Sequence, residues 1–121
     1  MAFVVLQGPV IRAGESLSEG LNCTSGDLLR ITMPTEWDEA PLSFQVSSTD
    51  SNYNDAFEIT GFEVMLPTVV PNSAIIVPVH VSRAIGWIKF RSGSRGNPVV
   101  QTAERLFRVA ISTYTGQGPS A

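Results

Sequence analysis

The chain has 121 residues, of which 43% are hydrophobic and only 16% are charged, so it can form one domain with a well-filled core. This composition excludes disorder along the whole length, and the apolar runs are far shorter than the ~20 residues of a membrane-spanning helix. The formal net charge of −3 and a pI near 5.0 argue against a nucleic-acid-binding domain, which is usually strongly basic.

The charges are unevenly distributed along the chain. Residues 1–66 carry ten acidic and two basic side chains, whereas residues 67–121 carry one acidic and six basic side chains. Two interpretations follow. Either the two halves interleave in the fold and the charge asymmetry averages out, or the molecule has one acidic and one basic face suited to head-to-tail contacts.

The N-terminal segment is apolar, with Phe3, Val4, Val5 and Leu6 in succession. It is short and lacks the basic region of a signal peptide, so we expect the product to stay in the cytoplasm where it is made. Residues 1–9 form either an arm that adds to a neighbour's sheet edge or the first strand of the domain's own sheet. The single cysteine, Cys23, fits a reducing compartment, and we expect it to be a small core residue.

Farther along the chain, hydrophobic and polar residues alternate with period two, which predicts strands of ordinary length. The alternating segments are residues 27–33, 42–47, 62–66, 75–82, 87–91 and 106–111. Polar or Gly/Pro-containing turns at residues 49–55, 71–73 and 92–98 separate several of them. The pattern predicts an all-β, antiparallel β-sandwich, jelly-roll-like or barrel-like, with a domain over residues 1–114 and a flexible tail at 115–121.

Two local features modify this prediction. Pro78 places its strand at an edge or a bulge, because proline cannot donate to a sheet ladder. Residues 35–40 follow Pro34, and a capping pair of Thr35 and Asp38 predicts one helical turn there. Trp37 would then cover one end of the core.

No combination of residues predicts catalysis. His80 is the only histidine, so a two-histidine metal site is absent, and no Gly-x-Ser-x-Gly motif surrounds a serine. Cys23 has no base beside it in the sequence, which favours a structural role. We therefore expect that the chain is not an enzyme and uses no cofactor.

The best acidic cluster lies at residues 50–55. Its first, third and fifth positions imitate the oxygen ligands of an EF-hand loop, but Asp55 replaces the required glycine and Gly61 the bidentate glutamate. A solvated loop is the main interpretation and adventitious Ca²⁺ binding remains open, so no structural metal site is predicted.

A basic set follows in the second half of the chain. Arg91 and Arg95 bracket a Gly/Ser-rich segment that resembles nucleic-acid-binding loops in composition, but the acidic pI favours contact with a protein partner. The predicted partner-binding residues are the apolar N-terminal four, Phe3, Val4, Val5 and Leu6, together with Trp87, Lys89, Arg91, Arg95 and Arg108.

One ordered run of short motifs is distinctive, with a Pro34…Trp37 pair early in the chain and an Arg-Ser-Gly…Pro…Gln pattern at residues 91–101. The full run comprises residues 11–18, 29–34, 36–37, 42–47, the loop around Asp50 and Tyr53, and residues 88–93, 97–101 and 103–105. In this order the motifs resemble a family of small tailed-phage and prophage proteins encoded among head and head–tail morphogenesis genes. The resemblance spans residues 10–112, and the chain departs from it at residues 3–6 and 69–71.

The resemblance implies a virion component, a capsid decoration (cement) protein that binds the major capsid protein on the capsid exterior as a homo-oligomer. It implies no catalytic residues, no nucleic acid and no membrane. A neck or tail component of the virion is a variant of the same interpretation. A carbohydrate- or receptor-binding module is the alternative, since β-sandwiches carry many functions and Trp87, Tyr53 and Tyr114 could stack on sugar rings.

Overall fold

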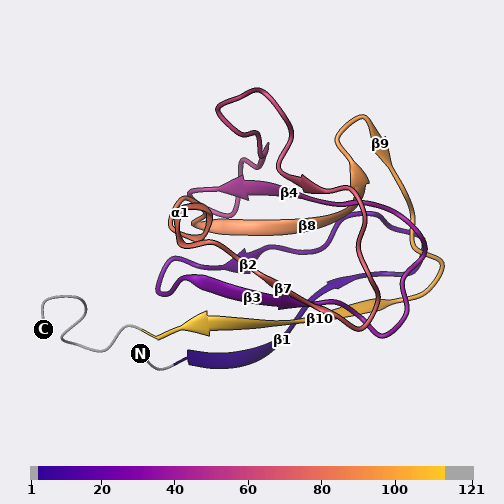
Figure 1. Ribbon diagram of the computed structural model, residues 1–121, viewed down its shortest axis with the longest axis horizontal. Helices are drawn as coiled ribbons and strands as arrows, with labels where there is room; N and C mark the ends of the chain where they lie inside the picture. Colours follow the sequence, from indigo (N-terminus) through magenta and orange to yellow (C-terminus); the bar gives the residue numbers. More distant parts are fainter. Residues whose placement is uncertain (1–2, 114–121) are drawn as a thin grey trace, which may run out of the picture.

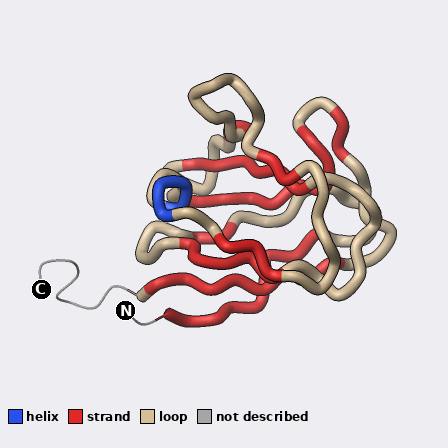
Figure 2. The backbone as a smooth tube through the Cα atoms, viewed as in Figure 1, coloured by secondary structure: helices blue, strands red, loops and turns tan. Residues whose placement is uncertain are grey.

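A computed structural model describes residues 3–113, and these form two packed antiparallel β-sheets with one short helix (Figures 1 and 2). The predicted all-β sandwich is confirmed, and no closed barrel forms in the described part of the chain. Sheet A has the strand order β1 (Phe3–Ile11), β10 (Arg105–Ser112), β3 (Leu28–Thr32) and β7 (Ala74–Ile76). Sheet B has the order β2 (Leu21–Asn22), β8 (Trp87–Ser94), β4 (Leu42–Ser47) and β5 (Asn54–Asp55), with β6 (Met65–Leu66) paired to β4 and β9 (Asn97–Pro98) to β8.

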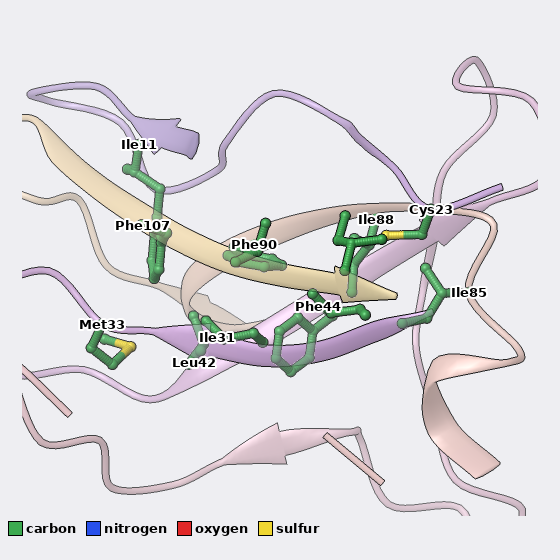
Figure 3. Packing of buried hydrophobic residues seen from close by; sticks show 13 residues of the cluster. Ile11, Cys23, Ile31, Met33, Leu42, Phe44, Ile85, Ile88, Phe90 and Phe107 are labelled. Carbon is green, nitrogen blue, oxygen red and sulfur yellow. The ribbon is translucent and has the colours of Figure 1, made fainter. Parts of the chain in front are cut away.

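The core lies between the sheets, where alternate residues of the long strands meet (Figure 3). Phe90 of β8 and Phe107 of β10 are fully buried, and their rings pack edge to face with centroids 5.0 Å apart. Each buried phenylalanine contributes about 2–3 kcal/mol of hydrophobic stabilisation. The predicted alternation of β8, β10 and β4 is confirmed by the burial of their inward residues.

The period-two pattern of residues 27–33 predicts that Leu29, Ile31 and Met33 share one face of the strand. Ile31 and Met33 are buried, but Leu28 is buried in place of Leu29. An irregularity in the pairing of β3 with β10 causes this difference, because Ala110 lies opposite Arg30 and the next residue, Ile111, lies opposite Leu28, which leaves Leu29 as an extra residue on β3. A β-bulge of this kind changes which residues face the core.

The prediction of a strand over residues 75–82 is wrong beyond Ile76. Strand β7 ends there, and the helix α1 (Val79–Ser82) follows, with Pro78 at its N-cap. Proline has no backbone N–H to donate to a sheet ladder, and its ring fixes the backbone angle φ, which is −64° at Pro78. The strand therefore ends before Pro78, and the helix begins after it. His80, expected on a strand, is an exposed residue of this helix.

The helical turn predicted at residues 35–40 does not form, since this segment contains only bends. The expectation for Trp37 is nevertheless confirmed. Its ring packs edge to face on Phe107 with centroids 5.7 Å apart, and its indole N–H donates to the Ala40 carbonyl. Asp38 makes bonds to residues 101, 102 and 105 instead of capping a helix.

The strand predicted at residues 62–66 is shorter than expected. β6 covers only Met65–Leu66, and the residues before it belong to a tight hairpin. No helix in residues 3–113 is long and apolar enough to span a membrane. Residues 1–2 and 114–121, which include Tyr114 and the predicted tail, lie outside the described residues.

Candidate docking surfaces

The first exposed apolar surface is the N-terminal half of β1. This segment is the first strand of the domain's own sheet, paired with β10 from Phe3↔Ser112 to Ile11↔Arg105. It lies at the edge of sheet A, so one side of its backbone has no neighbouring strand among the described residues. Phe3, Val4, Val5 and Leu6 are each 42–53% exposed, although they point alternately to the two faces of the sheet. Both faces of this half-strand are therefore apolar and solvent-exposed.

The outer face of sheet A continues this surface. Strand pairing places Val5, Ala110, Arg30 and Ile76 in one row across all four strands. The adjacent row contains Gln7, Arg108, Thr32 and Ala74. The rows between these point inward, since Val109 and Ile31 are buried. The outer face of sheet A thus combines apolar side chains with two arginines.

Arg30 has an unusual environment on this face. Its guanidinium carbon lies 5.9 Å from the centroid of the Phe3 ring, a cation–π contact. Its Nε is buried and has no hydrogen-bond partner among the described residues. Neither Arg30 nor Arg108 has a carboxylate of residues 3–113 within 4.0 Å.

The second exposed apolar surface is a hairpin at residues 56–64, hereafter the apolar hairpin. Hydrogen bonds from the Glu58 N–H to the Phe62 carbonyl (2.7 Å) and from the Gly61 N–H to the Glu58 carbonyl (2.9 Å) close its turn. Gly61 adopts a positive φ of 96°, which glycine tolerates best. Ile59 at the tip is fully exposed, and Phe57 and Phe62 are more than half exposed. The hairpin projects beyond β4 at the top of Figure 1.

A buried arginine anchors this hairpin to sheet B. Arg91 lies on the outer face of β8, is only 6% exposed, and donates to Asp55 before the hairpin and to Glu63 within it, at 2.6 Å each. Its Nε also donates to the Ser43 hydroxyl on β4. Arg95 adds a 3.0 Å bond from its Nε to Asp55 and a backbone bond to Glu63. The hydrogen bond from Arg91 is the main cause that holds the pKa of Asp55 below its ordinary value.

A second polar network lies inside the sandwich, centred on Gln101. This side chain is fully buried, and its amide donates to the Ser92 hydroxyl and to the Asp38 carbonyl. Its carbonyl oxygen accepts from the Asp38 N–H and from the Arg105 Nε, both at 2.9 Å. The network fixes the 35–40 segment on the core. The backbone N–H of Thr102 is the main cause that lowers the pKa of Asp38.

The predicted partner-binding residues of the second half of the chain do not form one surface. Trp87, Lys89 and Arg91 do share the outer face of sheet B, as the alternation predicts. Arg91, however, is buried in ion pairs within the domain and cannot meet a partner directly, and Arg95 is engaged by Asp55. The Lys89 Nζ lies 4.5 Å from the centroid of the Tyr53 ring. Arg108 is exposed on the other sheet, apart from these residues.

The charge asymmetry has a structural explanation. Each ion pair in the described part of the chain joins a base of residues 67–121 to an acid of residues 1–66, at Asp27, Glu36, Asp38, Asp55 and Glu63. Strands from the two halves alternate across sheet A and through β2, β8 and β4 of sheet B. Much of the asymmetry is therefore neutralised inside the fold, in agreement with the first of the two interpretations.

The acidic 50–55 loop directs its carboxylates to different partners. Asp50 accepts a hydrogen bond from the Tyr53 hydroxyl, whose pKa is raised mainly by burial, while Asp55 faces Arg91. Residues 3–113 contain no group of three His, Cys, Asp or Glu side chains that could hold a metal ion. Cys23 is buried in the core as predicted, and burial, with Asp27 nearby, raises the pKa of its thiol to about 11.

Sequence reasoning identified the β1 residues but missed the apolar hairpin. A signal was present, because Phe57 and Ile59 alternate before the turn residues Thr60 and Gly61. The prediction of a strand over residues 62–66 placed Phe62 in that strand, so the hairpin was not recognised. Comparisons with protein-family models, curated proteins and solved structures found no match for this chain.

Proposed function

We propose that this protein is a structural virion component, a capsid decoration protein that binds and reinforces the lattice of a phage major capsid protein. The observation that carries the proposal is the edge strand β1. Its N-terminal half exposes apolar side chains on both faces, and one of its backbone edges has no neighbouring strand among residues 3–113. Soluble proteins usually protect such edges with charges or covering loops. The motif resemblance to small phage head proteins adds support.

The open edge suits one docking mode. An extended segment of the capsid protein adds as a further antiparallel strand beside β1, so that main-chain hydrogen bonds give affinity. Val4 and Leu6, which pair with the buried residues Ile111 and Val109, then bury against it on the inward side of sheet A. A neck or tail location in the same virion would use the same edge with a different partner.

The carbohydrate-binding alternative has less support. The Lys89 Nζ lies over one face of the Tyr53 ring and the Tyr53 hydroxyl donates to Asp50, so both parts of this side chain already have partners within the domain. Trp87 is half-buried on the outer face of sheet B, and Tyr114 lies outside the described residues.

Co-sedimentation with capsids assembled from the major capsid protein tests the proposal. We expect the protein to pellet with capsids and the Val4→Lys/Leu6→Lys variant to lose most of this binding, since lysines on an edge strand oppose strand addition. Val70→Lys, at an exposed apolar position outside β1, is the matched control and should bind normally. Melting curves confirm that each variant is folded. Normal capsid binding by the β1 variant would refute the edge-docking proposal.

A further inference from the structure

The apolar hairpin is not used by the docking mode proposed above. Three large apolar side chains, Phe57, Ile59 and Phe62, are exposed together within six residues. Glu58 lies between the first two, and its carboxylate has no ion-pair partner among the described residues. The tip is thus an apolar projection with one unpaired negative charge. Exposed apolar clusters of this kind mark interaction sites.

The hairpin is also held in one position before any partner arrives. Asp55 and Glu63 flank its apolar residues, and both are fixed on the buried guanidinium of Arg91. The Ala56 N–H donates to the Phe44 carbonyl of β4, and the Val64 N–H to the Ala56 carbonyl. An element fixed in this way loses less conformational entropy when it binds, which favours recognition.

The outer face of sheet A has the complementary properties. Phe3, Val5 and Ile76 are each more than half exposed there. Arg30 and Arg108 lie in the two rows of this face and have no carboxylate partner in residues 3–113. The face is therefore apolar with unpaired positive charge, which matches the apolar hairpin in chemistry and opposes it in sign.

We propose that the apolar hairpin of one copy docks on the outer face of sheet A of a second copy. Ile59 and Phe62 pack against the apolar side chains of that face, and Glu58 pairs with Arg108 or Arg30. The hairpin carries an unpaired negative charge and the sheet A face of the same chain carries unpaired positive charges. A second copy of this chain therefore offers the hairpin a complementary surface.

The two surfaces differ, and β1 and the 56–64 loop lie on opposite sides of the molecule in Figure 1. The contact is therefore head-to-tail, and repetition gives a ring if the rotation closes or a row if it does not. This self-association goes beyond attachment to a capsid. It uses the face of sheet A, whereas the proposed strand addition uses the backbone edge of β1.

Sedimentation velocity of the full-length protein over a range of concentrations tests the apolar part of the contact. We expect the wild type to form concentration-dependent oligomers and Ile59→Ser/Phe62→Ser to weaken association by about tenfold or more, because buried apolar anchors dominate such contacts. Val70→Ser should associate like the wild type, because Val70 is also exposed but lies outside both surfaces. A wild type that stays monomeric up to about 1 mM would overturn the proposal.

A charge exchange identifies the partner surface. Glu58→Arg and Arg108→Glu should each weaken association by about tenfold, since an attraction becomes a repulsion. An equimolar mixture of the two variants should regain association. When the two variants alternate, the hairpin of each meets the sheet A face of the other, and every such contact again joins opposite charges.

The control for this exchange is Glu39→Arg, which changes an exposed acid outside both surfaces and should associate like the wild type. If both variants are folded and their mixture still fails to associate, this pairing is contradicted.

Discussion

The Gln101 network and the Arg91 network begin at neighbouring residues of β8 and serve opposite sides of the same sheet. Ser92 points inward and accepts from Gln101, whereas Arg91 points outward and donates to Asp55 and Glu63. The inner network fixes a segment whose Trp37 closes the core. The outer network fixes a segment whose apolar side chains remain in solvent. Similar polar chemistry therefore completes the core on one side and presents a docking element on the other.

The largest expected effect comes from breaking the inner network. Gln101→Leu leaves the Asp38 N–H, the Ser92 hydroxyl and the Arg105 Nε without their buried partner. An unsatisfied buried group costs about 1–3 kcal/mol, so we expect the free energy of unfolding to fall by about 3 kcal/mol in urea titrations. Arg91→Met should cost less, because the hairpin can open locally and expose its carboxylates to water. Equal losses for the two variants would contradict the distinction between the networks.

A smaller effect on the free energy of unfolding is expected from lowering the pH, through the Asp55 carboxylate of the Arg91 network. The pKa of Asp55 is lowered in the folded protein, mainly by the Arg91 hydrogen bond, so its contribution is complete above the ordinary aspartate pKa of about 3.9. That contribution is lost as the pH falls through the lowered folded-state pKa. Asp55→Asn should therefore be less stable than the wild type by about 1 kcal/mol at pH 7, with the difference shrinking by pH 3. Urea titrations at both pH values check this, with Glu58→Gln as control. A difference independent of pH would exclude the Asp55 carboxylate as its source.

Sequence predicted the long strands well because their inward residues must alternate to fill one core. Phe107, Val109 and Ile111 show this in β10, and all three are buried. The sequence-based prediction failed where a local irregularity decided the outcome, as at Pro78, which starts a helix, and at Leu28, where an extra residue in β3 changes the register. Period-two patterns contain no information about such shifts.

The candidate surfaces were predictable only in part. The exposed apolar residues of β1 could be recognised, but their place at an edge depends on long-range pairing with β10. The role of Arg91 could not be read from the sequence, since its partners Asp55 and Glu63 precede it by 36 and 28 residues. The Arg-Ser-Gly…Gln motif instead marks residues that hold the fold together, because Ser92 and Gln101 meet inside the sandwich.

The central claim is that buried Arg91 holds the apolar hairpin in place, and hydrogen exchange followed by NMR tests it most directly. The amides of Ala56, Glu58 and Val64 are bonded within the hairpin or to β4, while the Phe90 amide is bonded to Ser18 in the core. In Arg91→Met we predict that the three hairpin amides lose protection and that the Phe90 amide keeps most of its own. Unchanged protection of the hairpin, or a parallel loss at Phe90, would contradict the account.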